Sequence, residues 1–218
     1  MRARWALAVS GISVELREVA LSSKPAAMLA ASSKATVPVL IDVDNRVIDE
    51  SLDIMLWALR QNDPATWLSP QVGALDEMLR LIAQCDDEFK FNLDRYKYPE
   101  RFGIADAKAH RAGAANFLRL LEARLQKNAY LFGAHPSLAD IAIAPFVRQF
   151  ALTDATWFKQ QSWPGLRRWL NELIESPMFA LVMTRYYRWQ PDQAPIYFPF
   201  ASGNGVSPAP ADVNGALR

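Results

Sequence analysis

The stretch Lys34–Leu59, KATVPVLIDVDNRVIDESLDIMLWAL, decides the fold. Two short β-type runs, Val37–Ile41 and Arg46–Ile48, flank a turn rich in Asp and Asn at 42–45. This arrangement predicts a β-hairpin. The apolar residues that follow have helical density, and Ser51 is the expected N-cap of their helix. The sequence therefore predicts a hairpin that leads directly into an amphipathic helix.

Several groups in this stretch suit a small zwitterionic peptide. Pro38 cannot donate to a strand ladder, so it belongs at a strand start or edge, where the backbone of Val37 is free to pair with an extended ligand. The carboxylate of Glu50 suits an ammonium group. The Ser51 hydroxyl and the free N–H groups of the new helix suit a carboxylate. On the residues alone, a capped hairpin-to-helix connection without a ligand is an equal interpretation.

The motifs VPVL (37–40) and DESLDI (49–54) resemble the glutathione-site half of the thioredoxin-like domain in cytosolic glutathione S-transferases, including the glutaredoxin-2-like members. The resemblance implies that Pro38 is cis and that the backbone of the residue before it pairs with the cysteinyl part of glutathione. It also implies that the Glu-Ser pair holds the γ-glutamyl end, and, by a weaker match, that a lysine approaches the glycyl carboxylate. The implied glutathione-binding residues are Lys34, Val37, Pro38, Glu50 and Ser51.

Composition sets outer limits on the function. The chain has 218 residues, 51% of them hydrophobic and 22% charged, which is typical of a soluble globular protein with one large or two small domains. The net charge of +1 predicts no bulk attraction to nucleic acid or to an anionic membrane. No apolar run is long enough to predict a membrane span. The single cysteine, Cys85, excludes an intramolecular disulfide and fits a reducing, cytoplasmic location.

The resembled domain begins with a strand that this sequence does not show. The patterns predict a helix at 1–10, a strand at 12–19 and a short helix at 24–31 before the hairpin. In the resembled family a central strand precedes these elements, lies between the strands at 12–19 and 37–41, and is followed by the catalytic Tyr, Ser or Cys. Three interpretations remain: the natural start lies upstream, the two flanking strands pair directly, or the half-domain is loose. No catalytic residue is assigned.

The second half of the sequence predicts an all-helical domain. Residues 62–70 form the expected linker, and apolar residues at helical spacing predict long helices over 72–93 and 107–125. Ser137-x-x-Asp140 has the form of a capping box before an apolar, buried helix, a second match to the resembled family. We interpret Asp140 as structural, with a cost of roughly 0.5–2 kcal/mol for its replacement by alanine.

Other candidate residues carry weaker signals. The resemblance places Arg95, Tyr96 and Tyr98 in an acceptor-substrate pocket. The residues alone favour a helix end with its aromatics in the core, and a single-stranded nucleic-acid motif is a weaker alternative. Acidic neighbours oppose thiolate formation at Cys85, so we interpret it as a buried structural residue. His110 and His135 lack metal-ligand spacing, so no metal site is expected.

The sequence thus predicts an α+β protein with four segments. These are a partial thioredoxin-like glutathione-binding domain (1–61, first strand missing), a linker (62–70), an all-α helical-bundle domain like that of glutathione S-transferases (71–190), and a tail that is disordered at its end (191–218). The resemblance implies conjugation of glutathione to a small electrophile, provided that an upstream catalytic strand exists, and it implies a homodimer. The alternatives are a glutaredoxin-like oxidoreductase that reduces disulfides and a non-catalytic glutathione-binding or interaction protein. No nucleic-acid, membrane or metal partner is expected.

Overall fold

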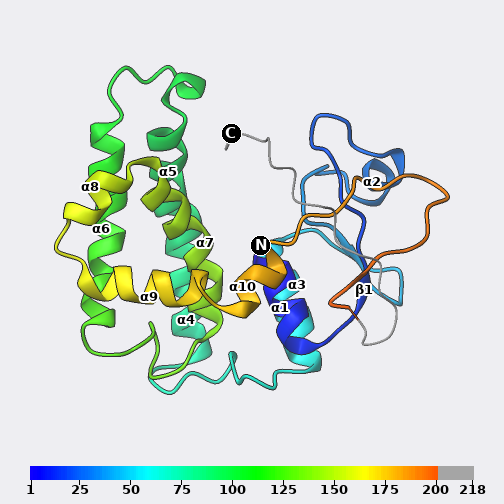
Figure 1. Cartoon of the computed structure of the whole chain (residues 1–218), viewed down its shortest axis with the longest axis horizontal. Coiled ribbons are helices and arrows are strands. Elements are labelled where there is room, and N and C mark those ends of the chain that lie inside the picture. Colours follow the sequence, from blue (N-terminus) through cyan, green and yellow to red (C-terminus); the bar gives the residue numbers. More distant parts are fainter. Residues whose placement is uncertain (201–218) are drawn as a thin grey trace. The chain divides into compact units, whose positions relative to one another are not determined.

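The computed structural model describes residues 1–200 and divides them between two units, each with its own core (Figure 1). Unit 1 consists of Met1–Pro64 together with the described chain from Pro177 onward. Unit 2 consists of Ala65–Ser176. None of the helices within residues 1–200 is long and apolar enough to cross a bilayer.

Two helices make the core of unit 1. Helix α1 (Arg2–Ser10) packs against α3 (Ser51–Gln61), and both bury apolar side chains such as Trp5 and Met55. The helix predicted at 1–10 is confirmed, and its C-cap is Gly11, whose left-handed φ of 70° is readily adopted by glycine. At this end the side-chain amide of Asn62 donates to the carbonyl of Ser10 at 2.8 Å, which ties the start of the chain to the end of α3.

The predicted hairpin is confirmed, with shorter strands than expected. Strand β2 (Leu40–Ile41) pairs antiparallel with β3 (Val47–Ile48), and Leu40 lies opposite Ile48. The carboxylate of Asp42 accepts hydrogen bonds from the backbone N–H groups of Asp44 and Arg46 and from the Arg46 guanidinium. These bonds, with the Arg46 backbone bond first, hold the pKa of Asp42 below its ordinary value. A single carboxylate therefore organises the turn.

Strand β1 (Val14–Glu15) pairs with β4 (Tyr197–Phe198) and not with β2. Within residues 1–200 the two sheets are separate two-stranded ladders, so the hypothesis that the strands at 12–19 and 37–41 pair directly is wrong for this structure. The strand expected over 12–19 has only two ladder residues. The carbonyl of Ile196 accepts a further bond from Leu16 N–H at 2.6 Å.

The chain after residue 176 belongs to unit 1. Helix α10 (Pro177–Val182) packs on α1, and in the segment after it the backbone N–H of Trp189 donates to the backbone carbonyl of Glu18 at 2.8 Å. The helical domain expected over 71–190 therefore ends at Ser176 in the structure, because the following segment finds its partners in unit 1. Phe198, which lay in the expected tail, is fully buried. The expected disorder at the chain's end concerns residues 201–218, outside the described residues.

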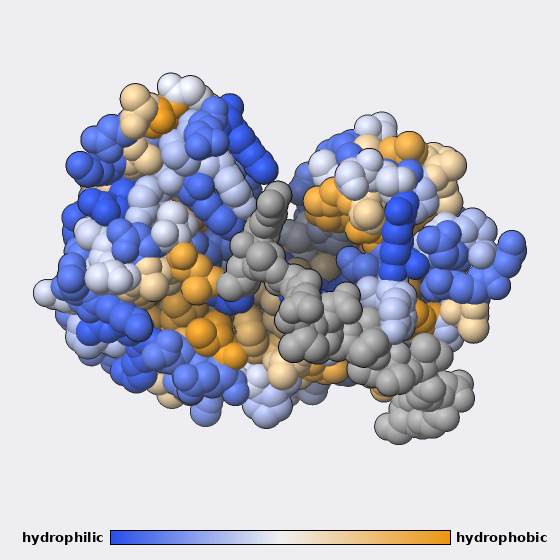
Figure 2. Space-filling model, turned by 45° about the horizontal axis from the view of Figure 1, so that its top comes forward, coloured by the Kyte–Doolittle hydropathy of each residue, from blue (hydrophilic) through white to orange (hydrophobic). Residues whose placement is uncertain are grey.

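Unit 1 also exposes apolar surface. Helix α2 (Ala26–Ala31) has the sequence AAMLAA and buries none of its residues. Apolar residues are visible on the surface of this unit at the right of Figure 2. Exposed large side chains here include those of Leu21, Leu29 and Val43.

The elements of unit 2 are helices, apart from an isolated β-bridge between Tyr130 and Gly133. Helix α4 (Leu75–Gln84), a π-helical segment η1 (Cys85–Phe89) and α5 (Lys90–Lys97) form one continuous helical run. It corresponds to the single helix predicted over 72–93, but the π segment interrupts its regular spacing. The remaining elements of the unit are the 3₁₀ turn η2 (Pro99–Phe102), α6 (Lys108–Leu125), α7 (Leu138–Thr153), α8 (Ala155–Gln160) and α9 (Pro164–Ile174).

Helix α7 is the buried centre of unit 2, and the predicted capping box at its start is confirmed. The fully buried carboxylate of Asp140 accepts from the N–H and Oγ–H of Ser137, from Leu131 N–H and from the indole N–H of Trp169, at 2.6–2.8 Å. It therefore joins the helix start to the preceding loop and to α9. No group of it is free for chemistry on a substrate.

We expect Asp140→Ala to lower the unfolding free energy by more than the loss of an N-cap hydrogen bond alone would. The substitution leaves several buried donors without an acceptor, at roughly 1–3 kcal/mol each, so the loss in unfolding free energy should be about 3–5 kcal/mol instead of the 0.5–2 kcal/mol expected from capping alone. Urea unfolding of the full chain measures this loss. The control Asp76→Asn, at an exposed position in α4, should change the unfolding free energy little. A normal melting temperature for Asp140→Ala would contradict the structural role.

Candidate glutathione site

The hairpin brings the two halves of the predicted site together. Leu40 pairs with Ile48 and Ile41 with Val47, and at the open end of the hairpin Pro38 precedes β2 by two residues while Glu50 follows β3 by two. The Val37–Pro38 peptide bond is cis, as the resemblance implied. The proline and the glutamate, twelve positions apart in the sequence, thus lie at the same end of the hairpin, where the chain turns into α3.

The backbone of Val37 is available to a ligand. Within residues 1–200 neither its N–H nor its C=O has a hydrogen-bond partner, and the residue is 47% exposed. Val37 was expected in a strand over 37–41, but β2 begins only at Leu40, and a role of Val37 in ligand binding stays a prediction. An N–H and a C=O on one extended residue form two bonds with the backbone of an extended peptide, as an additional strand would.

The start of α3 differs from the prediction by one residue. Glu50 occupies the N-cap position with an extended backbone, and Ser51 is the first helical residue, so the expectation that Ser51 is the N-cap is wrong. Glu50 makes no side-chain cap bond, and only its carbonyl enters the helix, accepting from Ile54 N–H at 3.0 Å. Among residues 1–200, neither the first-turn N–H groups of α3 nor the Ser51 hydroxyl has a hydrogen-bond partner. These donors can together bind an anionic group.

Lys34 forms ion pairs with two carboxylates at the start of α3. Its ammonium lies 2.6 Å from a carboxylate oxygen of Glu50 and 3.2 Å from one of Asp49. These hydrogen bonds, the one to Glu50 first, raise the pKa of Lys34. The Lys34 side chain is 49% exposed and that of Glu50 60%, so solvent screens the pair and both groups are free to exchange partners.

The structure adds two residues that the sequence prediction missed. Ser32 Oγ–H donates to Asp49 at 2.9 Å, and this bond, followed by the bond from Lys34, lowers the pKa of Asp49. Asp49 is therefore ionised at neutral pH and holds Lys34 beside Glu50. The only sequence signal was the position of Asp49 directly before Glu50-Ser51.

The expected acceptor-pocket residues have separate partners. The guanidinium of Arg95 lies 3.4 Å from the ring centroid of Phe91, and the ring of Tyr96 packs at 5.2 Å on that of Phe150. The ring of Tyr98 faces the guanidinium of Arg101 at 4.3 Å. Burial, the largest cause, raises the pKa of Tyr96, which opposes its ionisation. A shared acceptor pocket for Arg95, Tyr96 and Tyr98 stays a prediction.

The remaining sequence candidates show no reactive arrangement. Cys85 is buried and forms no disulfide. His110 Nδ1 lies 2.9 Å from the side-chain oxygen of Asn92, and His135 is exposed in the loop before α7. Across the described residues 1–200, no group of three or more His, Cys, Asp or Glu side chains is placed to hold a metal ion.

Many solved structures share this fold. A glutathione transferase from Phanerochaete chrysosporium in complex with oxidized glutathione matches with a TM-score of 0.72 and 18% identity, over 83% of this chain and 88% of that one. A glutathione S-transferase from Rhodospirillum rubrum F11 matches with a TM-score of 0.68 and 23% identity, over 85% and 87%. A glutathione transferase from Burkholderia graminis, with two glutathione molecules bound per subunit, matches with a TM-score of 0.70 and 19% identity, over 83% and 81%.

These identities are low, so the structural matches show the fold alone, and no curated protein matches this sequence. The family follows from the sequence models. The model of the glutathione S-transferase N-terminal domain matches residues 1–67. The model of the C-terminal domain matches residues 48–172, which is more than half of the chain. The chain therefore belongs to the glutathione S-transferase family.

Proposed function

We propose that this chain binds glutathione at the end of the β2–β3 hairpin. The observation that supports the proposal is the β2–β3 hairpin, because the cis Val37–Pro38 bond precedes β2 and Glu50 follows β3 at the start of α3. An unpaired backbone, a carboxylate and a helix N-terminus then lie together. Glutathione carries a matching extended backbone, an ammonium group and two carboxylates.

Each group in the site has a counterpart in the ligand. The N–H and C=O of Val37 pair with the cysteinyl backbone. Glu50 takes the γ-glutamyl ammonium, and the Ser51 hydroxyl with the first-turn N–H groups takes the γ-glutamyl carboxylate. In the free protein the ion pair with Glu50 holds the Lys34 ammonium group at the start of α3. When glutathione binds, Lys34 leaves Glu50 and pairs with the glycyl carboxylate.

The proposed chemistry is transfer of the glutathione sulfur to a small electrophile, with reduction of a disulfide as a second candidate. Both reactions need a hydroxyl or thiol that lowers the pKa of the glutathione thiol, and none of the residues discussed above is assigned that role. Binding without catalysis, as a glutathione sensor or interaction protein, is the non-enzymatic alternative. A screen measures consumption of glutathione by the full chain with electrophiles and with disulfides. Turnover of an electrophile indicates a transferase, turnover of a disulfide indicates an oxidoreductase, and no turnover indicates the non-enzymatic alternative.

We further propose that the acceptor lies near Arg95, Tyr96 and Tyr98, that the protein works as a homodimer, and that it resides in the reducing cytoplasm. The single buried thiol, Cys85, supports the last point. Light scattering of the purified chain at several concentrations tests the dimer, for which twice the chain mass of 24.5 kDa is expected.

We expect Glu50→Gln to weaken glutathione binding about tenfold, because the substitution keeps the shape of the side chain and removes the charge opposite the ammonium group. Isothermal titration with reduced glutathione measures the change. Glu15→Gln is the matched control, because Glu15 is an exposed glutamate of the same unit. Unchanged affinity in Glu50→Gln would remove Glu50 from the site.

A second variant tests the role of Lys34. We expect Lys34→Gln to weaken glutathione binding about two- to fivefold, since the lysine is exposed and its attraction to the glycyl carboxylate is screened. The same variant should bind the glycyl monoethyl ester of glutathione as well as the wild-type chain does. Equal losses for both ligands would show that Lys34 acts only by holding Glu50 in place.

A further inference from the structure

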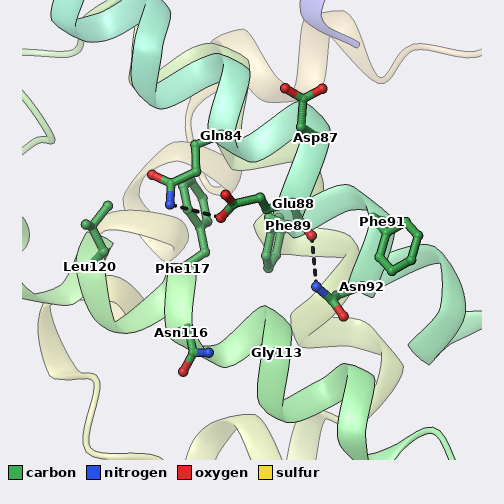
Figure 3. Close-up of a pocket in the computed structure, with 10 residues that line it drawn as sticks. All are labelled: Gln84, Asp87, Glu88, Phe89, Phe91, Asn92, Gly113, Asn116, Phe117 and Leu120. Atoms are coloured by element: carbon green, nitrogen blue, oxygen red, sulfur yellow. Dashed lines mark hydrogen bonds between the residues drawn. The ribbon is translucent and has the colours of Figure 1, made fainter.

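The proposed chemistry needs a hydroxyl or thiol beside the glutathione sulfur, and several groups do not supply one. In the proposed site the Ser51 hydroxyl is taken by the γ-glutamyl carboxylate, and Ser32 donates to Asp49. A cavity of about 540 Å³ lies in unit 2 between residues 84–92 and 113–120, but none of the side chains drawn in Figure 3 bears a hydroxyl or a thiol. The other hydroxyl groups of unit 1 are therefore the candidates.

One hydroxyl of unit 1 is buried and has no partner. Tyr186 lies in the coil after α10 and is 9% exposed. Its hydroxyl is the one buried side-chain nitrogen or oxygen among residues 1–200 that forms no hydrogen bond. A buried polar group without a partner destabilises a fold, so its presence needs an explanation. A ligand that accepts the missing hydrogen bond is such an explanation.

The first turns of α1 and α3 lie at the same end of unit 1. The two helices pack along each other, and the bond from Asn62 to Ser10 joins their carboxyl ends. They therefore run parallel, side by side in Figure 1, so their amino ends are neighbours. The amino end of α3 carries Glu50 and Ser51. The start of α1 thus lies on the side of unit 1 that holds the candidate glutathione site.

Contacts before and after Tyr186 hold it at this end of α1. The guanidinium of Arg4, in the first turn of α1, lies 5.1 Å from the ring centroid of Tyr186 and donates to the carbonyl of Thr184 at 3.1 Å. Arg4 also pairs with Glu18, whose backbone carbonyl accepts from the N–H of Trp189. The chain on both sides of Tyr186 is therefore tied to the start of α1.

The surroundings keep the Tyr186 hydroxyl protonated. Burial, the largest cause, raises the pKa of Tyr186, although the Arg4 guanidinium acts in the opposite direction. The hydroxyl is therefore a hydrogen-bond donor at neutral pH. A donor shielded from water forms a stronger hydrogen bond with an anion than with a neutral group, so this hydroxyl favours a thiolate over a thiol.

We propose that Tyr186 donates the hydrogen bond that stabilises the thiolate of bound glutathione. This inference rests on the proposed function and assigns the donor that its chemistry requires. The thiol releases its proton to water, Tyr186 keeps its own, and a sulfur electron pair forms the bond to the electrophile as the leaving group departs. In the free chain the hydroxyl is covered and Phe200 packs on the ring at 6.3 Å, so the coil around Tyr186 opens when the sulfur binds.

Two ligands separate the sulfur from the rest of glutathione. Reduced glutathione and γ-glutamyl-alanyl-glycine share their backbone and charged groups, but the second has no sulfur. Calorimetry measures the affinity of the full chain for each ligand. The ultraviolet absorbance of the thiolate, followed across pH, gives the pKa of the bound glutathione thiol. We expect the wild-type chain to bind both ligands and to hold this pKa below the ordinary thiol value of about 8.5.

Tyr186→Phe keeps the ring and removes the hydroxyl. It should raise the pKa of the bound thiol by about one to two pH units relative to the wild-type chain, and change the affinity for the sulfur-free peptide by less than about twofold. Its melting temperature should be equal or higher, because the hydroxyl that it removes has no partner. Tyr187→Phe, at the exposed neighbouring tyrosine, is the matched control and should change neither quantity.

The outcomes separate this inference from the proposed function. An unchanged thiol pKa in Tyr186→Phe, in a chain that binds both ligands, would overturn the role of Tyr186 and leave the glutathione site standing. A wild-type chain that binds neither ligand would contradict the proposed function itself. An equal rise of the thiol pKa in Tyr187→Phe, or a clear loss of melting temperature in Tyr186→Phe, would show that packing of the coil and not the hydroxyl is responsible.

Discussion

The candidate site depends on the antiparallel register that pairs Leu40 with Ile48. A slip of one residue would turn every side chain of a strand to the other face and would move Pro38 away from Glu50. The register is held at the turn, where the Asp42 carboxylate accepts two backbone N–H groups and the Arg46 guanidinium. The buried carboxylate of Asp42, at the turn of the hairpin, therefore helps to position the exposed carboxylate of Glu50 at the open end.

The surroundings of this hairpin are unusual for a sheet. The ladder of β1 is completed by β4, which comes from the other end of the described chain and carries the buried Phe198. Arg4 links the same segment to α1 through hydrogen bonds to the carbonyls of Val182 and Thr184. The segment after residue 176 thus supplies unit 1 with a strand, a helix and part of its core. It leaves the backbone of Val37 unpaired.

Local chemistry made parts of this structure predictable. The hairpin, the stop of α1 at Gly11 and the capping box at Ser137 and Asp140 each depend on residues close in sequence, and each was predicted. The cis bond before Pro38 followed from the family resemblance. The β1–β4 pair could not be predicted because it joins segments about 180 residues apart, and neither segment has a pattern that specifies its partner.

Other features lack a local signal. Nothing in the residues Cys85–Phe89 marks a π-helical segment, since their apolar spacing fits an α-helix. Lys34 was placed near a ligand carboxylate, but its bonds to Asp49 and Glu50 depend on how the loop before β2 folds back on the start of α3. For Arg95, Tyr96 and Tyr98 the sequence gives no signal that decides which neighbours each side chain meets, because that depends on packing.

The most direct test of the account is an NMR titration of the full ¹⁵N-labelled chain with reduced glutathione. The account predicts saturable shifts, at micromolar to millimolar ligand, of the Val37 amide and of the first-turn amides of α3. A folded chain whose Val37 and Ser51 amides stay unchanged at saturating glutathione would contradict the proposed site.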